Sequence, residues 1–481
     1  MTFLIIDLGS SSIRTMLFDE SARLIPGTIV RRSHQFVTQP DGASLADAEM
    51  LRTQVEACLD DILSHPAASH ISAVGMTTLV SNLVGLDVNS HPLTPLYTYA
   101  DTQSAEDAAA LKQEIDAEAA HQRTGGLVHT AYWPARFRWL QRTQPALWRQ
   151  VHHWQDLGTY VYEQWFGRPV PCSYSVASWS GLLNRERLAW DETWLRHLDV
   201  SSASLPPLAD YTQTQQGLMD RYAQRWPQLR DVPFYLAIGD GAAANIGSGA
   251  VEAGVAALTV GTTAALRMVS REVNPPVPAG LWSYRVDAAH HLMGGATSEG
   301  GNIFQWMRET FQLPSEAEME TRLAHATPDA HGLTFLPLLA GERSPGWALN
   351  ASGTIHGLRL STRPLDILQA ALEGVALRLA AVAQQLNRAE RIMASGAALE
   401  KSSAWLQMMA DALARPIALL AETELAARGT ALLLLSAQEG HRLTDYPPQI
   451  KHMIAPREAG VRALSAARER QRALYDMLYK L

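Results

Sequence analysis

A short turn of glycine and hydroxyl residues near the N-terminus has the composition of a phosphate-binding loop. Gly9, Ser10, Ser11 and Ser12 directly follow the apolar stretch 2–8. Backbone N–H groups and short hydroxyls that converge on one spot bind phosphate oxygens, and glycine lets the chain turn tightly there. A plain β-hairpin with a serine-rich turn has the same pattern, so one copy leaves both interpretations open.

Two charged residues flank this turn. Asp7 stands two residues before the glycine, where its carboxylate can hold a hydrated Mg²⁺ against the phosphates. Arg14 lies in the apolar stretch after the turn, within reach of an outer phosphate. The turn and its flanks therefore predict a metal–phosphate site.

A second turn of the same kind occurs about half a chain later. Gly261, Thr262 and Thr263 follow an apolar stretch and precede another that also carries an arginine. A matched pair of strand–turn–strand segments at this separation favours two related domains. We expect the two hairpins to hold ATP between them.

Asp240 is the best candidate for a catalytic base. It follows the apolar stretch 234–238 and opens a segment of small residues, where a ligand can approach closely. The N-terminus of a helix favours the charged carboxylate, which suits a base. Aspartate is also a common helix N-cap, and that alternative stays open here.

Tyr99 and Asp101 form a candidate sugar-binding pair. An aromatic ring covers the C–H face of a sugar, and a nearby carboxylate accepts its hydroxyl protons. A capping role for Asp101 before a helix that starts near residue 105 is equally compatible with the sequence.

These residues need elements to position them, and strand and helix patterns alternate along the chain in a manner typical of α/β domains. The glycine-rich stretch 245–255 predicts the boundary, which gives domains 1–246 and 247–481. Expected strands cover 71–77, 82–87, 234–238 and 392–395, and expected helices cover 105–120, 364–387, 402–413 and the segment after residue 456.

Composition excludes several classes of protein. The 481 residues include 47% hydrophobic and 18% charged residues, as in a well-packed globular protein, and the net charge of −8 argues against a nucleic-acid partner. Two cysteines, Cys58 and Cys172, cannot form a disulfide framework. Neither a signal peptide nor a membrane-spanning run is found, so we expect a cytoplasmic protein without a membrane partner.

Four segments together resemble the FGGY carbohydrate kinases. They are Asp7-Leu-Gly-Ser-Ser-Ser-Ile-Arg14, Gly239-Asp-Gly-Ala-Ala-Ala-Asn-Ile-Gly247, Thr259-Val-Gly-Thr-Thr263 and Ser395-Gly-Ala397. The resemblance implies an actin-like ATPase fold, with two ribonuclease-H-like α/β domains around a central cleft. It also implies ATP as phosphoryl donor, with Mg²⁺.

The resemblance assigns roles by position. Asp240 matches the catalytic base and, with Asp7, the metal site. Glu400 stands where glycerol kinase has asparagine, which leaves the base contact there open. The implied ATP-binding residues are Ser10, Ser11, Ser12, Arg14, Gly261, Thr262, Thr263, Gly301, Gln305, Gly396, Ala397 and Glu400. The implied substrate-binding residues are Val80, Ser81, Asn82, Tyr99, Asp101 and Asp240.

Within the family, the stretches 97–104, 178–184 and 336–347 are most similar to gluconokinases, which implies a sugar acid such as gluconate as acceptor. Val80 and Ser81 depart from the Met-His of gluconokinases and xylulokinases, so a ketose or polyol stays an alternative. An actin-like or chaperone-like ATPase and a catalytically inactive sugar sensor are the rivals from other classes. The oligomeric state, with a homodimer as one possibility, is open.

Overall fold

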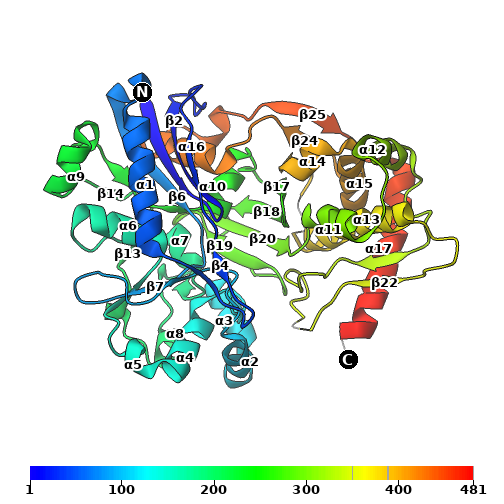
Figure 1. Cartoon of the computed structure of the whole chain (residues 1–481), viewed down its shortest axis with the longest axis horizontal. Helices are drawn as coiled ribbons and strands as arrows, with labels where there is room; N and C mark the ends of the chain where they lie inside the picture. Colours follow the sequence, from blue (N-terminus) through cyan, green and yellow to red (C-terminus); the bar gives the residue numbers. More distant parts are fainter. Residues whose placement is uncertain (349, 387–388, 480–481) are drawn as a thin grey trace.

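Two mixed β-sheets of seven strands each organise the chain (Figure 1). The structure is a computed structural model and describes residues 1–348, 350–386 and 389–479. The first sheet has the order β14 (Thr214–Gln215), β15 (Phe234–Tyr235), β6 (Ile71–Thr78), β1 (Thr2–Leu8), β2 (Ser12–Asp19) and β3 (Val30–Ser33), with β16 (Ile238–Gly239) also paired to β6. The second has the order β19 (Trp282–Arg285), β20 (His291–Thr297), β18 (Ala264–Ser270), β17 (Val255–Val260), β23 (Arg391–Ser395), β24 (Ile417–Leu420) and β25 (Ile450–Ile454).

The two sheets repeat one pattern of pairing. In the first sheet, β1 pairs antiparallel with β2 and parallel with β6. In the second, β17 pairs antiparallel with β18 and parallel with β23. The predicted repeat of two strand–turn–strand segments is therefore present, and each segment forms the centre of its own sheet.

Side chains of β1 alternate between two cores. Leu4, Ile6 and Leu8 pack with α1 (Ala48–Leu63) and α6 (Leu157–Phe166). The odd-numbered residues of the strand pack instead with α16 (Leu425–Glu439). Because both faces of the strand are covered, its sequence is a continuous apolar run rather than an alternating one.

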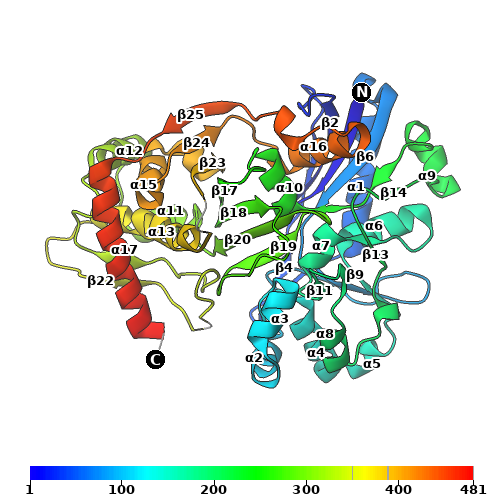
Figure 2. The same cartoon turned by 180° about the vertical axis from the view of Figure 1, so that it is seen from behind.

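Helix α16 connects the two halves of the molecule. It comes late in the chain, yet it packs against β1, β6 and α10 (Asp240–Gly247), among the N-terminal elements (Figure 2). Glycines allow the close approach of α10 and α16. A Cβ atom on Gly247 would lie 1.9 Å from the carbonyl oxygen of Leu425, and one on Gly429 would lie 1.8 Å from that of Ala243.

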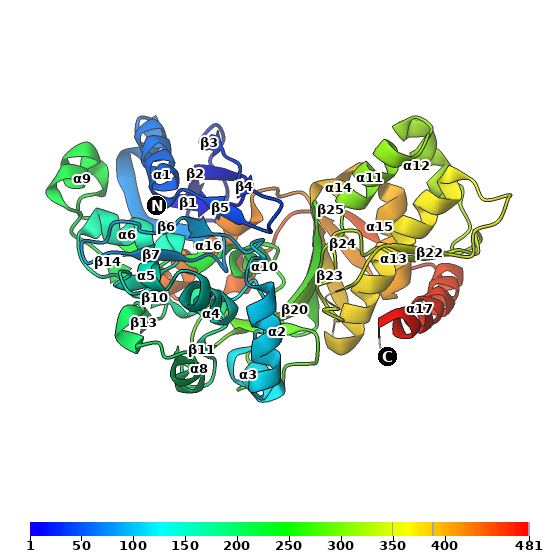
Figure 3. The same cartoon turned by 60° about the horizontal axis from the view of Figure 1, so that its bottom comes forward.

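The predicted single helix over 105–120 is wrong, because the chain forms α2 (Ala105–Glu114) and α3 (Ala117–Thr124). Ile115 has an extended backbone, and the Asp116 side chain accepts a hydrogen bond from the Ala119 amide and caps the second helix. These helices belong to a lobe at the lower left of Figure 3. Its other elements are α4 (Trp133–Thr143), α5 (Pro145–Trp148), α7 (Tyr174–Ser178), α8 (Glu192–His197), β7 (Val84–Leu86), β9 (His153–Gln155), β10 (Cys172–Ser173), β11 (Leu183–Asn184), β12 (Ala189–Trp190), β13 (Leu208–Ala209) and the 3₁₀ turn η2 (Ser202–Ser204).

The strand expected over 234–238 is also interrupted: it forms β15 and β16, and between them the Leu236 amide donates to the Tyr211 carbonyl at 3.2 Å. The strand expected over 82–87 is shorter and covers Val84–Leu86, and the other expected elements are present. The long helix is α13 (Pro364–Leu386), and the last expected residue, 387, lies outside the described part. Among the described residues, no helix combines the length and apolarity needed to cross a membrane. The remaining elements are α9 (Asp220–Arg225), α11 (Asn302–Thr310), α12 (Glu316–His325), α14 (Ala397–Lys401), α15 (Ser403–Leu413), α17 (Glu458–Tyr479), β4 (Val37–Thr38), β5 (Ser44–Ala46), β8 (Leu96–Tyr97), β21 (Thr334–Leu336), β22 (Thr354–His356) and the 3₁₀ turns Pro66–His70, Pro227–Leu229 and Leu443–Asp445.

Candidate functional site

Three parallel strands end at one edge of the first sheet and bring the candidate residues together there. Leu8 of β1 pairs with Thr78 of β6, and Thr78 also pairs with Gly239 of β16. Asp7 therefore lies one residue before this edge, and Asp240 lies one residue beyond it. Ligands of open α/β sheets bind at such carboxyl ends.

Asp7 lies in a buried, strongly charged environment. Its carboxylate accepts a hydrogen bond from Arg14 at 2.5 Å, and the same guanidinium contacts Glu424 at 2.5 Å. Burial raises the pKa of Asp7 to about 6, Arg14 opposes this, and the negative charges of Asp240 and Glu424 add to it. The carboxylates of Asp7, Asp240 and Glu424 thus lie near one another, and the Arg14 guanidinium contacts two of them. Carboxylate oxygens are a donor set that fits a hydrated Mg²⁺ held together with phosphate oxygens.

The raised pKa of Asp7 predicts a pH effect on folding. Because the folded state holds this proton more tightly than the unfolded chain, the stabilisation is present below about pH 4 and is lost as pH rises through about 6. We expect the ligand-free protein to lose up to about 3 kcal/mol of unfolding free energy from this group. Urea unfolding of the wild type and of Asp7→Asn between pH 4.5 and 7.5 measures this loss of unfolding free energy. If the unfolding free energies of the two proteins change with pH in parallel, the prediction is wrong.

Asp240 is the first residue of α10, and Gly239 takes the N-cap position. Its carboxylate accepts a hydrogen bond from the Gly241 amide at 2.7 Å. Burial raises the pKa of Asp240, and this amide and the nearby Arg267 guanidinium partly oppose the shift. The side chain keeps partial contact with solvent. A carboxylate with this pKa direction, at the end of a strand, is suited to accept a proton from a bound hydroxyl.

Two arginines mirror each other across the repeat. Arg14 of β2 contacts Glu424, the residue before α16. Arg267 of β18 donates to Thr259 at 2.9 Å and to the Gly241 carbonyl at 3.4 Å, at the start of α10. Each hairpin arginine therefore reaches the N-terminal end of a helix from the other half of the chain.

Val80 lies beside Gly239, the residue before Asp240, and Ser81 follows Val80 after the end of β6. A Cβ atom on Gly239 would lie 2.9 Å from Val80 Cγ1 and 2.9 Å from the indole nitrogen of Trp179. Ser81 has a positive φ of 56°, and its hydroxyl donates to the Trp179 carbonyl at 2.9 Å. Val80 and Trp179 thus form a wall next to the candidate base.

Asn82 and Asp101 are held by the protein itself. Asn82 is 1% exposed, donates to the Leu79 carbonyl at 2.7 Å and accepts from the Leu157 amide at 2.8 Å. Asp101 is fully buried and accepts from the Ser44 amide at 3.0 Å. These contacts give both side chains a role in fixing the loops.

Tyr99 and Arg136 differ from each other in exposure and role. Tyr99 is 44% exposed, so its ring is open to solvent. Arg136 is fully buried and donates to the carbonyl of Ser81 at 2.6 Å and also to that of Thr98. Arg136 therefore connects the loop that carries Ser81 to the loop that carries Tyr99.

The second hairpin gathers the glycines assigned to the nucleotide. Gly301 donates to the Gly261 carbonyl at 2.6 Å. Gly396 has a φ of 112°, and a Cβ atom there would lie 2.3 Å from the Val260 carbonyl oxygen. Thr262 and Thr263 are exposed at the tip, as are Ser10 and Ser11 at the first hairpin, whereas Ser12 is buried. Backbone and hydroxyl groups of both tips thus remain open to a ligand.

The other nucleotide candidates lie on two helices. Ala397 begins α14, and the Glu400 amide donates to the Gly396 carbonyl at 3.2 Å. The side chains of Ala397 and Glu400 are exposed. Gln305 lies in α11 and donates to Glu309 at 2.8 Å. The Leu399 amide also donates to the Gly396 carbonyl, at 3.1 Å, so the first turn of α14 is tied to the glycine turn through its backbone.

Sequence reasoning missed Glu424, Trp179 and Arg136. Glu424 has a weak signal, an acidic residue just before an apolar helix. Trp179 belongs to a stretch noted for its resemblance, but nothing in its spacing predicts a place beside Asp240. It stacks on Tyr284 with ring centroids 3.7 Å apart, and the Tyr284 hydroxyl contacts that of Tyr132 at 2.5 Å.

One further cluster has the residue types of a metal site. Asp329, His331 and Glu373 have ligand atoms within 4.8 Å of one another. His331 Nδ1 accepts from the Leu333 amide, so Nε2 carries the proton and donates to Glu373 at 3.1 Å. Asp329 pairs with Arg470. This protonation state blocks metal binding through Nε2, and the cluster is a complete hydrogen-bond network.

Comparisons with known proteins agree with this arrangement. The model of the FGGY family of carbohydrate kinases matches with its N-terminal domain at residues 2–247 and its C-terminal domain at 256–437. Gluconokinase of Bacillus subtilis is 27% identical over 452 residues, covering 90% of this chain and 86% of that protein. Glycerol kinase of Halorhodospira halophila is 29% identical over 402 residues, covering 80% and 77%. A crystal structure of gluconate kinase from Lactobacillus acidophilus superimposes with a TM-score of 0.92 at 23% identity, covering 99% of this chain and 98% of that one.

Proposed function

The chain belongs to the FGGY family of carbohydrate kinases and is an ATP-dependent sugar kinase, and we propose that its acceptor is gluconate or a closely related sugar acid. The observation that carries the proposal is the similarity to gluconokinase along 90% of the chain, combined with Asp240 at the carboxyl edge of the first sheet. The acceptor binds beside Val80, Ser81 and Trp179.

The two halves of the chain bind different substrates in this proposal. Residues 1–246 bind the acceptor and supply the first phosphate hairpin. Residues 247–481 bind the nucleotide through the second hairpin and the turn at Gly396. The exposed tips at Ser10, Ser11, Thr262 and Thr263 support this division, because both present hydroxyl and backbone groups.

Asp240 acts as the general base. It accepts the proton of the acceptor hydroxyl while that oxygen forms its bond to the γ-phosphorus of ATP and the bond from this phosphorus to the β–γ bridging oxygen breaks. Burial raises the pKa of Asp240, and the positive charge of the nearby Arg267 guanidinium opposes this rise. Donors of the two hairpins stabilise the charge that spreads over the phosphoryl oxygens.

Asp7 and Asp240 are the residues that would hold Mg²⁺, with Glu424 near them. The ion, when bound, neutralises charge on the phosphates. The Arg14 guanidinium lies between two carboxylates and donates to both Asp7 and Glu424. This pairing keeps the carboxylates close together without any ligand.

A comparison of acceptors tests the proposal. We expect kcat/KM for gluconate to exceed the values for xylulose, ribulose and glycerol by at least about tenfold, which corresponds to about 1.4 kcal/mol in transition-state binding. ADP release, measured with each acceptor and without any, is the readout. A neutral ketose or polyol that wins by the same factor would refute the sugar-acid acceptor.

The same assay separates the rival classes. A chaperone-like ATPase releases ADP in the absence of sugar, and an inactive sensor releases no ADP with any of the sugars. Asp240→Asn, run beside the wild type, controls for a contaminating kinase.

A further inference from the structure

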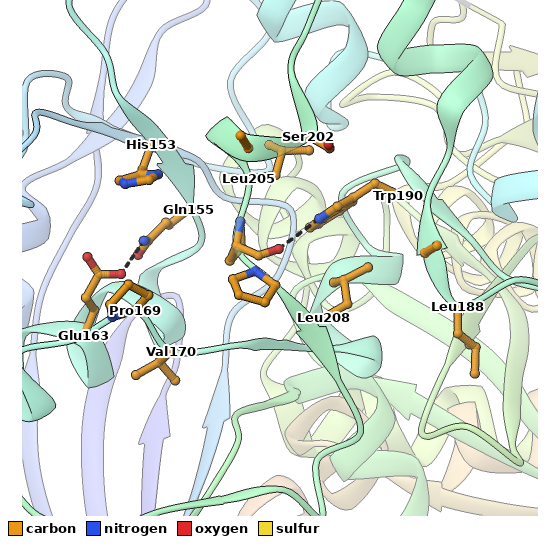
Figure 4. A pocket seen from close by; sticks show the side chains of 14 residues that line it. His153, Gln155, Glu163, Pro169, Val170, Leu188, Trp190, Ser202, Leu205 and Leu208 are labelled. Carbon is orange, nitrogen blue, oxygen red and sulfur yellow. Dashed lines mark hydrogen bonds between the residues drawn. The ribbon is translucent and has the colours of Figure 1, made fainter.

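A cavity of about 500 Å³ lies in the N-terminal half, outside the site described above (Figure 4). It is bounded by β9, α6, β12 and the turn η2. Its volume is within the range of pockets that bind small molecules. One end is polar, with His153, Gln155 and Glu163, and the rest is mostly apolar, with Val170, Trp190 and Leu208 among its walls.

The polar end holds a buried carboxylate whose partners are neutral. Glu163 is 6% exposed, and it accepts from the Gln155 amide at 2.6 Å and from the Ser90 hydroxyl. His153 is near it, but burial lowers the pKa of this imidazole, which is therefore neutral at pH 7. Among the described residues, no cationic side chain pairs with Glu163. A buried carboxylate of this kind gains from a cation in the cavity.

Gln155 adds an acceptor without a partner. The residue is 3% exposed, and donation to Glu163 fixes which end of its amide is nitrogen. Its Oε1 atom is buried and accepts no hydrogen bond from the described chain. This buried oxygen adds negative potential beside the Glu163 carboxylate, so the polar end of the cavity suits a cationic group.

Trp190 provides the rigid apolar wall. Its indole nitrogen donates to the Pro206 carbonyl at 2.9 Å, and its ring stacks on Trp133 with centroids 6.0 Å apart. These contacts hold the ring in one orientation. A fixed aromatic face favours a flat apolar ligand body.

We propose that this cavity is a second ligand site, for a small arylalkyl ammonium compound. The ammonium group pairs with Glu163, and the aromatic body lies along Trp190 and the apolar wall. The site is independent of the phosphoryl transfer reaction and does not rest on the choice of acceptor. It is linked to the acceptor loop through β9, which pairs with β7, the strand that follows Asn82, and through α6, whose Leu157 amide donates to the Asn82 side chain.

Calorimetric titration of the full-length protein at pH 7.5 tests this site, with 2-phenylethylammonium as probe and neutral 2-phenylethanol as its matched control. We expect saturable binding of the ammonium probe with Kd near or below about 1 mM, at least about tenfold tighter than the alcohol. Glu163→Gln keeps the size of the side chain and removes its charge. The affinity of this variant for the ammonium probe should therefore fall at least about tenfold, while its affinity for the alcohol should not change.

Ala203→Trp gives a second, independent arm. Ala203 is an exposed residue of η2 that lines the cavity, so a bulky side chain there fills the space without disturbing the core. Binding of both probes should be lost while sugar-kinase activity is kept. Equal affinity for ammonium and alcohol, no saturable binding of the ammonium probe, or undiminished binding to Ala203→Trp would each overturn the proposal.

Discussion

Replacing Asp240 by asparagine is expected to lower kcat by roughly 10²–10⁴-fold, the usual contribution of a general base. The amide has nearly the shape of the carboxylate, and it can still accept the hydrogen bond from Gly241, but it cannot take up the proton of the acceptor hydroxyl. Because the side chain lies beyond the end of the sheet, the fold and the affinity for ATP should be kept. Steady-state kinetics and nucleotide titration together separate loss of chemistry from loss of binding.

Asp220→Asn is the matched control for this prediction. Asp220 is also the first residue of a helix, α9, and it is exposed. We expect its substitution to leave kcat unchanged. Near-normal turnover of Asp240→Asn would remove the base assignment, and an equal loss in both variants would point to a general effect of charge.

Replacing Gly429 by alanine is expected to destabilise the fold strongly. Alanine in a helix interior normally gains about 1 kcal/mol over glycine. Here its Cβ would lie 1.8 Å from the Ala243 carbonyl oxygen, so α16 must move away from α10. Overpacking typically costs about 1–3 kcal/mol, and the close contact with rigid backbone places this site at the upper end of that range, which leaves a net loss of about 2 kcal/mol.

Denaturant unfolding of the variant measures this loss, and Gly126→Ala is the control. A Cβ atom on Gly126 would meet its nearest neighbours at 3.4 Å, an ordinary contact, so we expect a change within about 0.5 kcal/mol. A Gly429→Ala protein as stable as the wild type would mean that the two helices can separate at little cost. The contact would then be a mobile joint rather than a fixed one.

Local signals explain what could be predicted from the sequence. The two hairpins are encoded by apolar strands around a glycine and short hydroxyl residues, and both formed as expected. The helix that starts at Asp240 is encoded by the strand before it and the small residues after it. The break at Asp116 also has a local signal, since aspartate commonly caps a helix, but the alanine-rich composition on both sides masked it.

The sequence by itself determined the repeated hairpins, the strand–helix order and the family, because each depends on neighbouring residues or on a fixed set of motifs. Only the tertiary structure decided which distant residues meet. Glu424 contacts Arg14 across 410 positions, and Trp179 lies beside Gly239. Such contacts depend on how strands end at a common edge and how closely two helices pack, and no spacing in the chain records that. Asp101 shows the same limit: its motif predicts a sugar ligand or a helix cap, and only the structure shows that the side chain is buried and accepts from the Ser44 amide.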